Sequence, residues 1–555
     1  MSRVGPGLIL ALGVFLLYHL TFSSVPTSDG YFFASNIDHV DWDGMLIANS
    51  PLSSYFFFSL KRVLVSVGLA APTLAMMRTV SAIVAALGAM VLYALVRLLG
   101  GGTLLGLLGG ALLATSFGYW YFANGELHLL SLGVLLLMFG LLLRRRVTGT
   151  PYSYGFVVGL ALLNAVATLL HQENFLFGLT TISLFVVGRP WRRSLREALV
   201  YAIAGSLGTA LLVFAIGRFL RGISTAWGIL SWYIWIVEYM ERPQAYLLGN
   251  PLAIIGRVVK GQLTALIFGT QIVPDVVRTP RLLRYPTVDA LLAVTLVSYG
   301  LVALLVMDLW WTRRLLLARW RIPLVGCAVW FFSYKILLHW WYWPTSTEYH
   351  VVTLPPLVLL LLLGPIALRV GGDRPRGRLR VGTGGVAALL ALVLAVNYWG
   401  GIEPWYRYGR MKEWLTARFQ TEFRPDDFFV STESGVDSIF ANRARALPVK
   451  NVFLKESKTE AFEVIRTTVA TELRQGRRVF VYSFVPSPYA FLKINAYARV
   501  REGEMSPLDF ERFLDELRQR YAFRPVLSYW EESTEPLYLF GRRLETLWEI
   551  TPKAK

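Results

Sequence analysis

Histidines and carboxylates at the ends of apolar runs are the residues of this sequence best suited to chemistry. Imidazole transfers protons and ligates metals, and a carboxylate can act as a general base or bind a cation. The six histidines are His19, His39, His128, His171, His339 and His350. The nearby carboxylates are Asp29, Asp38, Asp41, Asp43, Glu126, Glu173 and Glu348. Any one of these residues can be interpreted as a solvated loop charge. Ionisable groups close to membrane depth are costly to bury and usually functional, so the grouping of these residues predicts a polar site.

The elements that position these residues are predicted to be membrane-spanning helices. Of the 555 residues, 55% are hydrophobic and only 16% are charged, against about 25% charged in soluble domains. An apolar run of about 20 residues is long enough to cross a bilayer as a helix. Eleven such runs occur, at 5–22, 75–98, 103–121, 127–143, 154–171, 174–188, 198–220, 288–310, 323–340, 351–368 and 382–399.

The loops between these runs alternate in charge, which predicts how the chain is oriented. One set is rich in arginine and the other is nearly balanced; the first set contains Arg97, Arg144 to Arg146, Arg189 to Arg196, Arg313 to Arg321 and Arg369 to Arg380. Basic loops stay in the cytoplasm, so the N-terminus is predicted to be cytoplasmic and residues 401–555 extracytoplasmic. The run 245–273 carries Arg257 and Lys260 at its centre and is interpreted as an interfacial or re-entrant helix. If it spanned instead, the orientation of everything after it would invert.

Residues 401–555 differ in composition from the rest of the chain. They carry 25 Lys+Arg against 22 Asp+Glu, whereas the chain as a whole has a net charge of +19. Strand-like runs at 428–430, 451–454, 479–484, 525–529 and 537–540 alternate with helical patterns, which predicts a small α/β domain. We therefore expect a polytopic helical domain at 1–400, with long outer loops 23–74 and 221–287, followed by an extracytoplasmic α/β domain at 401–555.

Several classes of function are poor fits to this sequence. The basic excess is interspersed with apolar runs, which favours membrane orientation over nucleic-acid binding. The single cysteine, Cys327, excludes a disulfide framework and a cysteine-based zinc or iron–sulfur site. No Walker loop or dinucleotide-binding glycine motif follows a predicted strand in 401–555, and that region has no histidine.

Several short motifs resemble those of GT-C glycosyltransferases, the polytopic enzymes of the protein O-mannosyltransferase and lipid A aminoarabinose transferase type. Ser28-Asp29-Gly30-Tyr31 follows the first run and precedes Asn49-Ser50-Pro51-Leu52 and an amphipathic stretch, as in the first outer loop of that superfamily. The other similar segments are Trp120 to His128, His171-Gln172-Glu173-Asn174, and Glu348-Tyr349-His350 with Leu354-Pro355-Pro356. The superfamily often has an acidic pair or a His-Pro pair in the first loop, and in place of the second this chain has Ser50-Pro51.

The resemblance implies an inverting glycosyltransferase that moves a sugar from a polyprenyl-phosphate donor to a glycan, lipid or protein acceptor at the outer membrane face. Asp29 would be the general base. The candidate substrate-binding residues are Glu126, His128, His171, Arg257, Lys260, Arg278, Glu348 and His350. The expected location is the plasma membrane of a prokaryote, with the lipid bilayer and no nucleic acid as a partner.

Two questions stay open at the level of sequence. The sequence identifies no cofactor, but a divalent cation is possible, with Asp38, Asp41 and Asp43 as candidate ligands. A transporter or flippase for a lipid-linked saccharide, or a non-catalytic envelope assembly protein, are the alternative functions. Transporters tend to be built from two related halves with broken helices, and no such halves are evident here.

Overall fold

The computed structural model describes residues 5–23, 28–46, 50–69, 71–125, 127–240, 251–273, 286–339, 347–370, 382–424, 426–431, 445–448, 452, 458–482, 507–531 and 543–553. The chain divides into two compact units. One comprises Met1–Phe22 with Pro26–Pro404, and the other comprises Ser23–Val25 with Trp405–Lys555.

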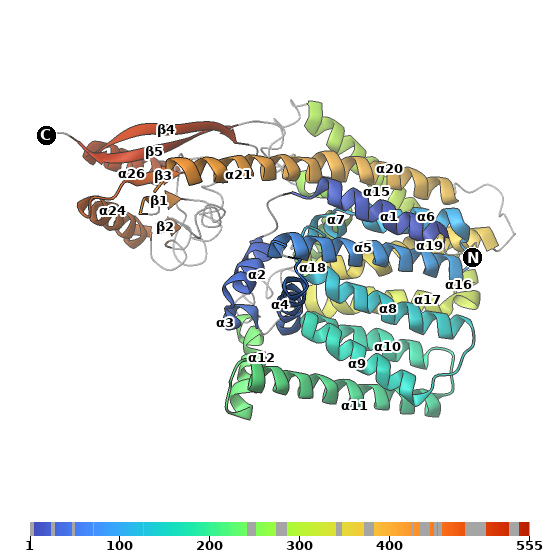
Figure 1. Cartoon of the computed structure of the whole chain (residues 1–555). Helices are drawn as coiled ribbons and strands as arrows, with labels where there is room; N and C mark the ends of the chain where they lie inside the picture. The colour runs from blue at the N-terminus through green and yellow to red at the C-terminus, as the bar shows by residue number, and fades with distance from the viewer. Residues whose placement is uncertain are drawn as a thin grey trace. The chain divides into compact units, whose positions relative to one another are not determined.

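The first unit is a bundle of long helices that pack side by side (Figure 1). Each of the eleven apolar runs is helical over most of its length, as predicted. The helices are α1 (Gly5–Thr21), α5 (Thr73–Leu98), α6 (Gly102–Thr115), α8 (His128–Val147), α9 (Tyr154–Leu170), α10 (Phe177–Val186), α11 (Trp191–Ala215), α15 (Pro286–Trp311), α17 (Arg321–Tyr334), α19 (Leu354–Val370) and α20 (Gly382–Asn397). This arrangement makes the unit a polytopic helical membrane protein.

The number of spans is not fixed by helix length alone. Within the described residues, six helices are long and apolar enough to cross a membrane, or seven if the bent pair Arg313–Arg319 and Arg321–Leu337 is one span. Three further apolar helices, α1, α6 and α9, are shorter than that criterion. Eleven spans therefore stays a prediction.

Small residues on α6 allow the helices to approach closely. A Cβ atom on Gly110 would lie 2.7 Å from the backbone oxygen of Ala89 on α5, and one on Gly109 would lie 2.5 Å from Leu362 on α19. Lipid provides no hydrophobic drive between helices, so close contact of this kind contributes much of the association. These glycines hold α6 between α5 and α19.

Short helices gather at one end of the bundle. The first predicted outer loop forms α2 (Ser28–His39), α3 (Trp42–Met45) and the amphipathic α4 (Pro51–Ser66), which pack on α5 through a core that includes Phe33, Phe57 and Met77. The second loop forms α12 (Ala226–Met240), α13 (Pro251–Leu266) and the 3₁₀ helix η4 (Phe268–Gln271). The other short elements of this end are α7 (Phe117–Phe122), η1 (Gln172–Leu176), α18 (Thr347–His350) and η7 (Val351–Thr353). The short helix α16 (Arg313–Arg319) lies instead at the opposite end, in one of the arginine-rich loops (Figure 1).

Three of the long helices end in a π-helical turn. These turns are η2 (Ile216–Leu220) after α11, η6 (Lys335–His339) after α17 and η8 (Tyr398–Ile402) after α20. Each of the three helices begins after one of the arginine-rich loops, so all three turns lie at the opposite end of the bundle from those loops.

The second unit contains a five-stranded sheet in the order β2-β1-β3-β5-β4. The parallel strands are β1 (Phe428–Ser431), β2 (Arg445–Pro448) and β3 (Val479–Tyr482), and β4 (Tyr521–Glu531) and β5 (Arg543–Pro552) add an antiparallel edge. The helices of this unit are α21 (Glu403–Glu422), α24 (Lys458–Arg474) and α26 (Pro507–Arg520). The predicted alternation of strands and helices is confirmed.

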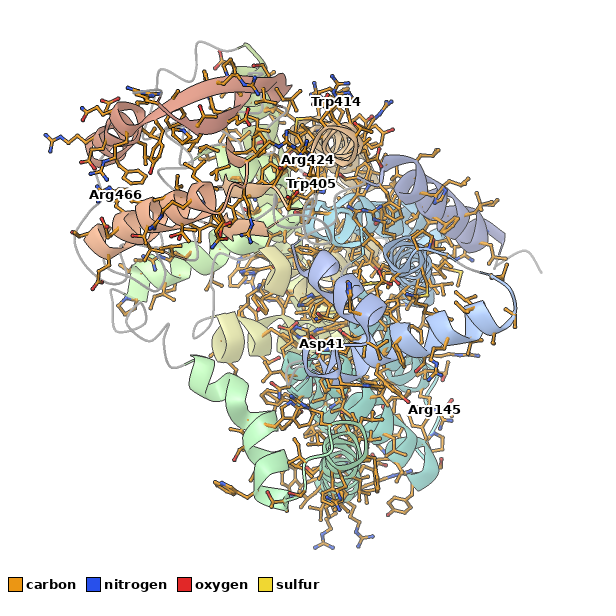
Figure 2. All side chains as sticks on the ribbon, turned by 60° about the vertical axis from the view of Figure 1, so that its left-hand side comes forward. Asp41, Arg145, Trp405, Trp414, Arg424 and Arg466 are labelled. Carbon is orange, nitrogen blue, oxygen red and sulfur yellow. The ribbon has the colours of Figure 1, made fainter. Side chains whose placement is uncertain are left out.

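The helices α24 and α26 cover the sheet through a shared apolar core. Phe462 and Phe513 stack with ring centroids 4.5 Å apart, and both belong to the core that contains Val479 and Val481 of β3. Arg466 on α24 pairs with Glu463, at 2.9 Å, and with Glu516 on α26, and its place on the unit is visible in Figure 2. The apolar faces of the two helices therefore specify how they meet the sheet.

One predicted strand is wrong in position. Of 451–454 the structure describes only Val452, which is helical, and the strand that pairs with β1 lies earlier, at 445–448. The reason is that β2 is only four residues long and contains arginine and proline, so it lacks the apolar alternation used to find strands. The predicted strand at 537–540 lies outside the described residues.

Candidate functional site

Five ionisable side chains from separate helices meet at the end of the bundle opposite the arginine-rich loops. They are His128 at the start of α8, His171 directly after α9, Glu173 at the start of η1, Lys335 at the start of η6, and His350 at the end of α18. All five are buried, and His350 has no exposed surface. We call this group the buried polar cluster.

His128, His171 and Glu173 form one half of the buried polar cluster. The rings of the two histidines lie with centroids 4.1 Å apart, and Nδ1 of His171 is 3.4 Å from Oε1 of Glu173. One nitrogen or oxygen from each of the three residues falls within 4.8 Å of the other two. Tyr349 approaches both imidazoles, with ring centroids 6.0 Å from His128 and 6.3 Å from His171.

Lys335 and His350 form the other half. The Lys335 ammonium and Nδ1 of His350 are in hydrogen-bond contact, and Lys335 also interacts electrostatically with Glu173. A lysine carries three N–H donors and no acceptor, so the imidazole nitrogen in this contact accepts. Lys335 therefore links the two halves and places a buried amine next to a buried carboxylate.

Side-chain hydrogen bonds hold the elements that carry these residues. Asn174 donates to the backbone oxygen of Ala167 at 3.1 Å and accepts from the Tyr334 hydroxyl at 3.2 Å, so η1 is tied to α9 and to α17. On the other side, the Thr353 hydroxyl donates to Gln262 on α13 at 2.6 Å. Bonds between distant helices fix the relative positions of the buried residues more tightly than packing alone.

A neutral imidazole has one unprotonated nitrogen, which can accept a hydrogen bond or bind a metal ion.

The other residues predicted for the site have different outcomes. His128, His171 and His350 are brought together. Arg257 is exposed and Lys260 is half-buried on α13, and no contact described here joins either to the buried polar cluster. Glu126 and Arg278 lie outside the described residues, as do the side chains of Asp29 and Glu348, although Asp29 falls in the first turn of α2.

The acidic residues suggested as metal ligands do not group in this way among the described side chains. Asp38 accepts hydrogen bonds from Lys61 and Thr73, which join α2 to α4 and α5. Asp38 and Asp41 are exposed, and the side chain of Asp43 lies outside the described residues. Asp38 therefore serves contacts between helices.

Lys335 is the cluster residue that the sequence reading missed. It was counted within the apolar run 323–340 and given no role. A charged residue inside a predicted span is itself a sign of function, and that sign was present.

Comparison with known proteins shows the fold and no closer relationship. No family model matches the sequence, and no curated protein matches it. The chain is similar to ArnT from Cupriavidus metallidurans, solved with bound undecaprenyl phosphate, with a TM-score of 0.52 at 11% identity over 99% of this chain and 98% of that one. The expected GT-C fold is therefore confirmed.

Two archaeal structures are similar at a lower level. They are the Archaeoglobus fulgidus oligosaccharyltransferase in the apo form and AglB from the same organism, solved with an inhibitory peptide and a dolichol-phosphate. The first has a TM-score of 0.46 at 14% identity, over 89% of this chain and 71% of that one. The second has a TM-score of 0.44 at 11% identity, over 97% of this chain and 74% of that one.

Proposed function

We propose that this protein is a membrane glycosyltransferase that takes a sugar from a polyprenyl-phosphate donor and transfers it to an acceptor at the extracytoplasmic face. The observation that carries the proposal is a buried lysine, Lys335, beside His350 and Glu173 in a chain with the GT-C fold. A buried amine is a costly group to desolvate, and when protonated it can bind the anionic phosphate of a lipid at the membrane boundary. The structure of ArnT holds undecaprenyl phosphate, which supports this class of donor.

The reaction we propose is a single inverting displacement. The acceptor oxygen attacks the anomeric carbon, the bond from that carbon to the phosphate oxygen breaks, and the acceptor proton passes to a carboxylate. Polyprenyl phosphate leaves with the bonding electrons and needs no general acid, because it is already a stable anion. Lys335 would stabilise the charge that develops on the phosphate. His350, which accepts from Lys335, would position the ammonium.

Asp29 is proposed as the general base, from its place in the first-loop motif and in the first turn of α2. Its carboxylate would have to lie within hydrogen-bond distance of the acceptor hydroxyl. Arg257, Lys260 and Arg278 are proposed to lie along the entry path of the donor phosphate, and Glu126 and Glu348 to bind sugar hydroxyls.

The proposal is tested by incubating the purified full-length protein with labelled polyprenyl-phosphate sugars. Release of the sugar, to an acceptor or to water, is the expected result. Asp29→Asn should abolish turnover with donor binding near that of the parent, whereas the matched change Asp41→Asn should keep activity within a few fold. If no donor in the panel is cleaved but the protein moves labelled lipid between the leaflets of a vesicle, the transporter interpretation is correct instead.

Lys335 provides a separate test at the level of binding. A charge-assisted hydrogen bond contributes about 1.5–3 kcal/mol, so Lys335→Met should weaken donor binding by about ten- to a hundredfold. Lys335→Arg keeps the charge and should retain more of the affinity. Equal donor affinity in the parent and in both variants would contradict a role for Lys335 in phosphate binding.

A further inference from the structure

We propose that His128, His171 and Glu173 form a binding site for a divalent metal ion, with Zn²⁺ as the ion that fits best. The three residues come from the start of α8, the end of α9 and the start of η1, and the sequence indicated no metal site there. The test of this proposal is independent of sugar transfer, because metal binding can be measured without any substrate.

The distances between the three side chains are close to those of a zinc site. Ligands about 2.1 Å from a tetrahedral zinc ion lie about 3.4 Å from one another. Nδ1 of His171 and Oε1 of Glu173 are already 3.4 Å apart. All three ligand atoms lie within 4.8 Å of one another, so the widest pair has to close by about 1.4 Å, which small side-chain rotations supply.

The types of ligand select the ion. Two imidazoles and one carboxylate suit zinc, whereas magnesium and calcium prefer sites built from oxygen alone. Three protein ligands leave the fourth tetrahedral position open, as in catalytic zinc sites, where a water or substrate oxygen completes the coordination. The exposed carboxylates Asp38 and Asp41 offer no such mixture of nitrogen and oxygen.

The surroundings favour a bound cation over three separately buried polar groups. All three side chains are at least 90% buried, so each is removed from bulk water in the bundle interior. A neutral imidazole has one unprotonated nitrogen that can bind a metal ion. A metal ion would bring the three ligands into one coordination shell and balance the charge of Glu173.

Lys335 is the competing partner for Glu173. Its ammonium interacts electrostatically with the same carboxylate, and it would repel a metal ion placed there. The two interpretations therefore predict opposite effects of removing the lysine. If Glu173 is a metal ligand, Lys335→Met should bind zinc at least as tightly as the parent. If Glu173 is only the counter-ion of Lys335, the same change leaves an unpaired carboxylate and creates no zinc affinity.

The test measures metal bound to the purified full-length protein in detergent. The protein is stripped with a chelator, loaded with Zn²⁺, passed through gel filtration and analysed by mass spectrometry for metal per chain. We expect stoichiometric zinc in the parent and in Lys335→Met. His171→Ala and Glu173→Gln each remove a proposed ligand of the metal. Each should therefore weaken zinc binding by more than the 10- to 100-fold that is typical when a residue that only supports a ligand is removed.

The matched control is His39→Ala, which removes an exposed histidine of α2 and should keep the zinc content of the parent. Co²⁺ loaded into the parent provides a measurement that needs no variant, because a tetrahedral site gives intense visible absorption and an octahedral aqua ion does not. Zinc well below stoichiometry in the parent, or zinc content unchanged in both His171→Ala and Glu173→Gln, would overturn the proposal.

Discussion

Asn397 ties three elements to α20, and its replacement should destabilise the bundle by a predictable amount. The side chain is fully buried. Its amide donates to the backbone oxygens of Thr115 at 2.7 Å and Leu266 at 2.8 Å, and its oxygen accepts from the backbone N–H of Phe268 at 2.7 Å. The ends of α6 and α13 and the start of η4 are therefore held by one residue.

The magnitude follows from these three bonds. Side-chain hydrogen bonds within membrane bundles contribute about 0.6 kcal/mol each, and buried bonds in soluble proteins about 0.5–1.5 kcal/mol. Asn397→Leu removes all three and leaves two carbonyls and one N–H buried without this partner, so the loss should be about 2–5 kcal/mol. The control Thr295→Val removes one hydroxyl that donates only to Leu291 on its own helix, at 2.6 Å, and should cost less than 1 kcal/mol.

The assay is unfolding of the purified protein in detergent, followed by heat or denaturant, with the two variants and the parent measured side by side. Asn397→Asp is informative as well, because it keeps the acceptor for Phe268 but places carboxylate oxygens against the oxygens of Thr115 and Leu266. It should destabilise at least as much as the leucine variant. If Asn397→Leu unfolds within 1 kcal/mol of Thr295→Val, the three bonds do not hold these helix ends together.

Three further predictions concern topology, donor binding and stability. In a Cys327→Ser background, a single cysteine that replaces Arg145 or Leu317 should be protected from a membrane-impermeant thiol reagent in intact cells. A cysteine that replaces Val67 should react with the same reagent. Labelling at position 317 would refute the predicted orientation. Of the alanine variants of Arg257 and Lys260, at least one should raise the apparent donor constant by about ten- to a hundredfold, and unchanged constants in both would place the donor phosphate elsewhere. Glu197 is a buried carboxylate that accepts hydrogen bonds from Arg189 at 2.8 Å and Arg193 at 3.3 Å. Glu197→Gln should therefore lower the free energy of unfolding by about 3 kcal/mol. A thermal shift assay that finds no change would contradict a structural role for Glu197.

The helices could be predicted from the sequence because long apolar runs have few structural solutions in a bilayer. Their exact lengths could not. The run 174–188 was expected to be helical throughout, and it begins instead as the 3₁₀ turn η1, in which Asn174 bonds back to Ala167. A polar residue at the start of a run can make such local bonds, and periodicity does not reveal them.

The site could be predicted only in part, for a different physical reason. His128, His171 and His350 were each recognised by residue type and by position at a helix end. Their meeting point depends on which helices are neighbours, and positions more than 200 residues apart in the sequence carry no information about distance. Lys335 went unrecognised because a lysine within an apolar run was counted only as part of a span.

The π-helical turns have a consequence for how a bundle of this kind can change its chemistry. A π turn amounts to one residue inserted into an α-helix, which rotates every later side chain by about 100° about the helix axis. In α17 the part before the turn packs on α10 and α19, and Lys335 stands at the first position of the turn. The orientation of residues from Lys335 onward is thus set separately from the packing before it. Single-residue insertions and deletions at η2, η6 and η8 would redirect side chains at the end opposite the arginine-rich loops, while the helix contacts before each turn stay in register. Related chains could therefore diversify at that end by changes in length as well as by substitution.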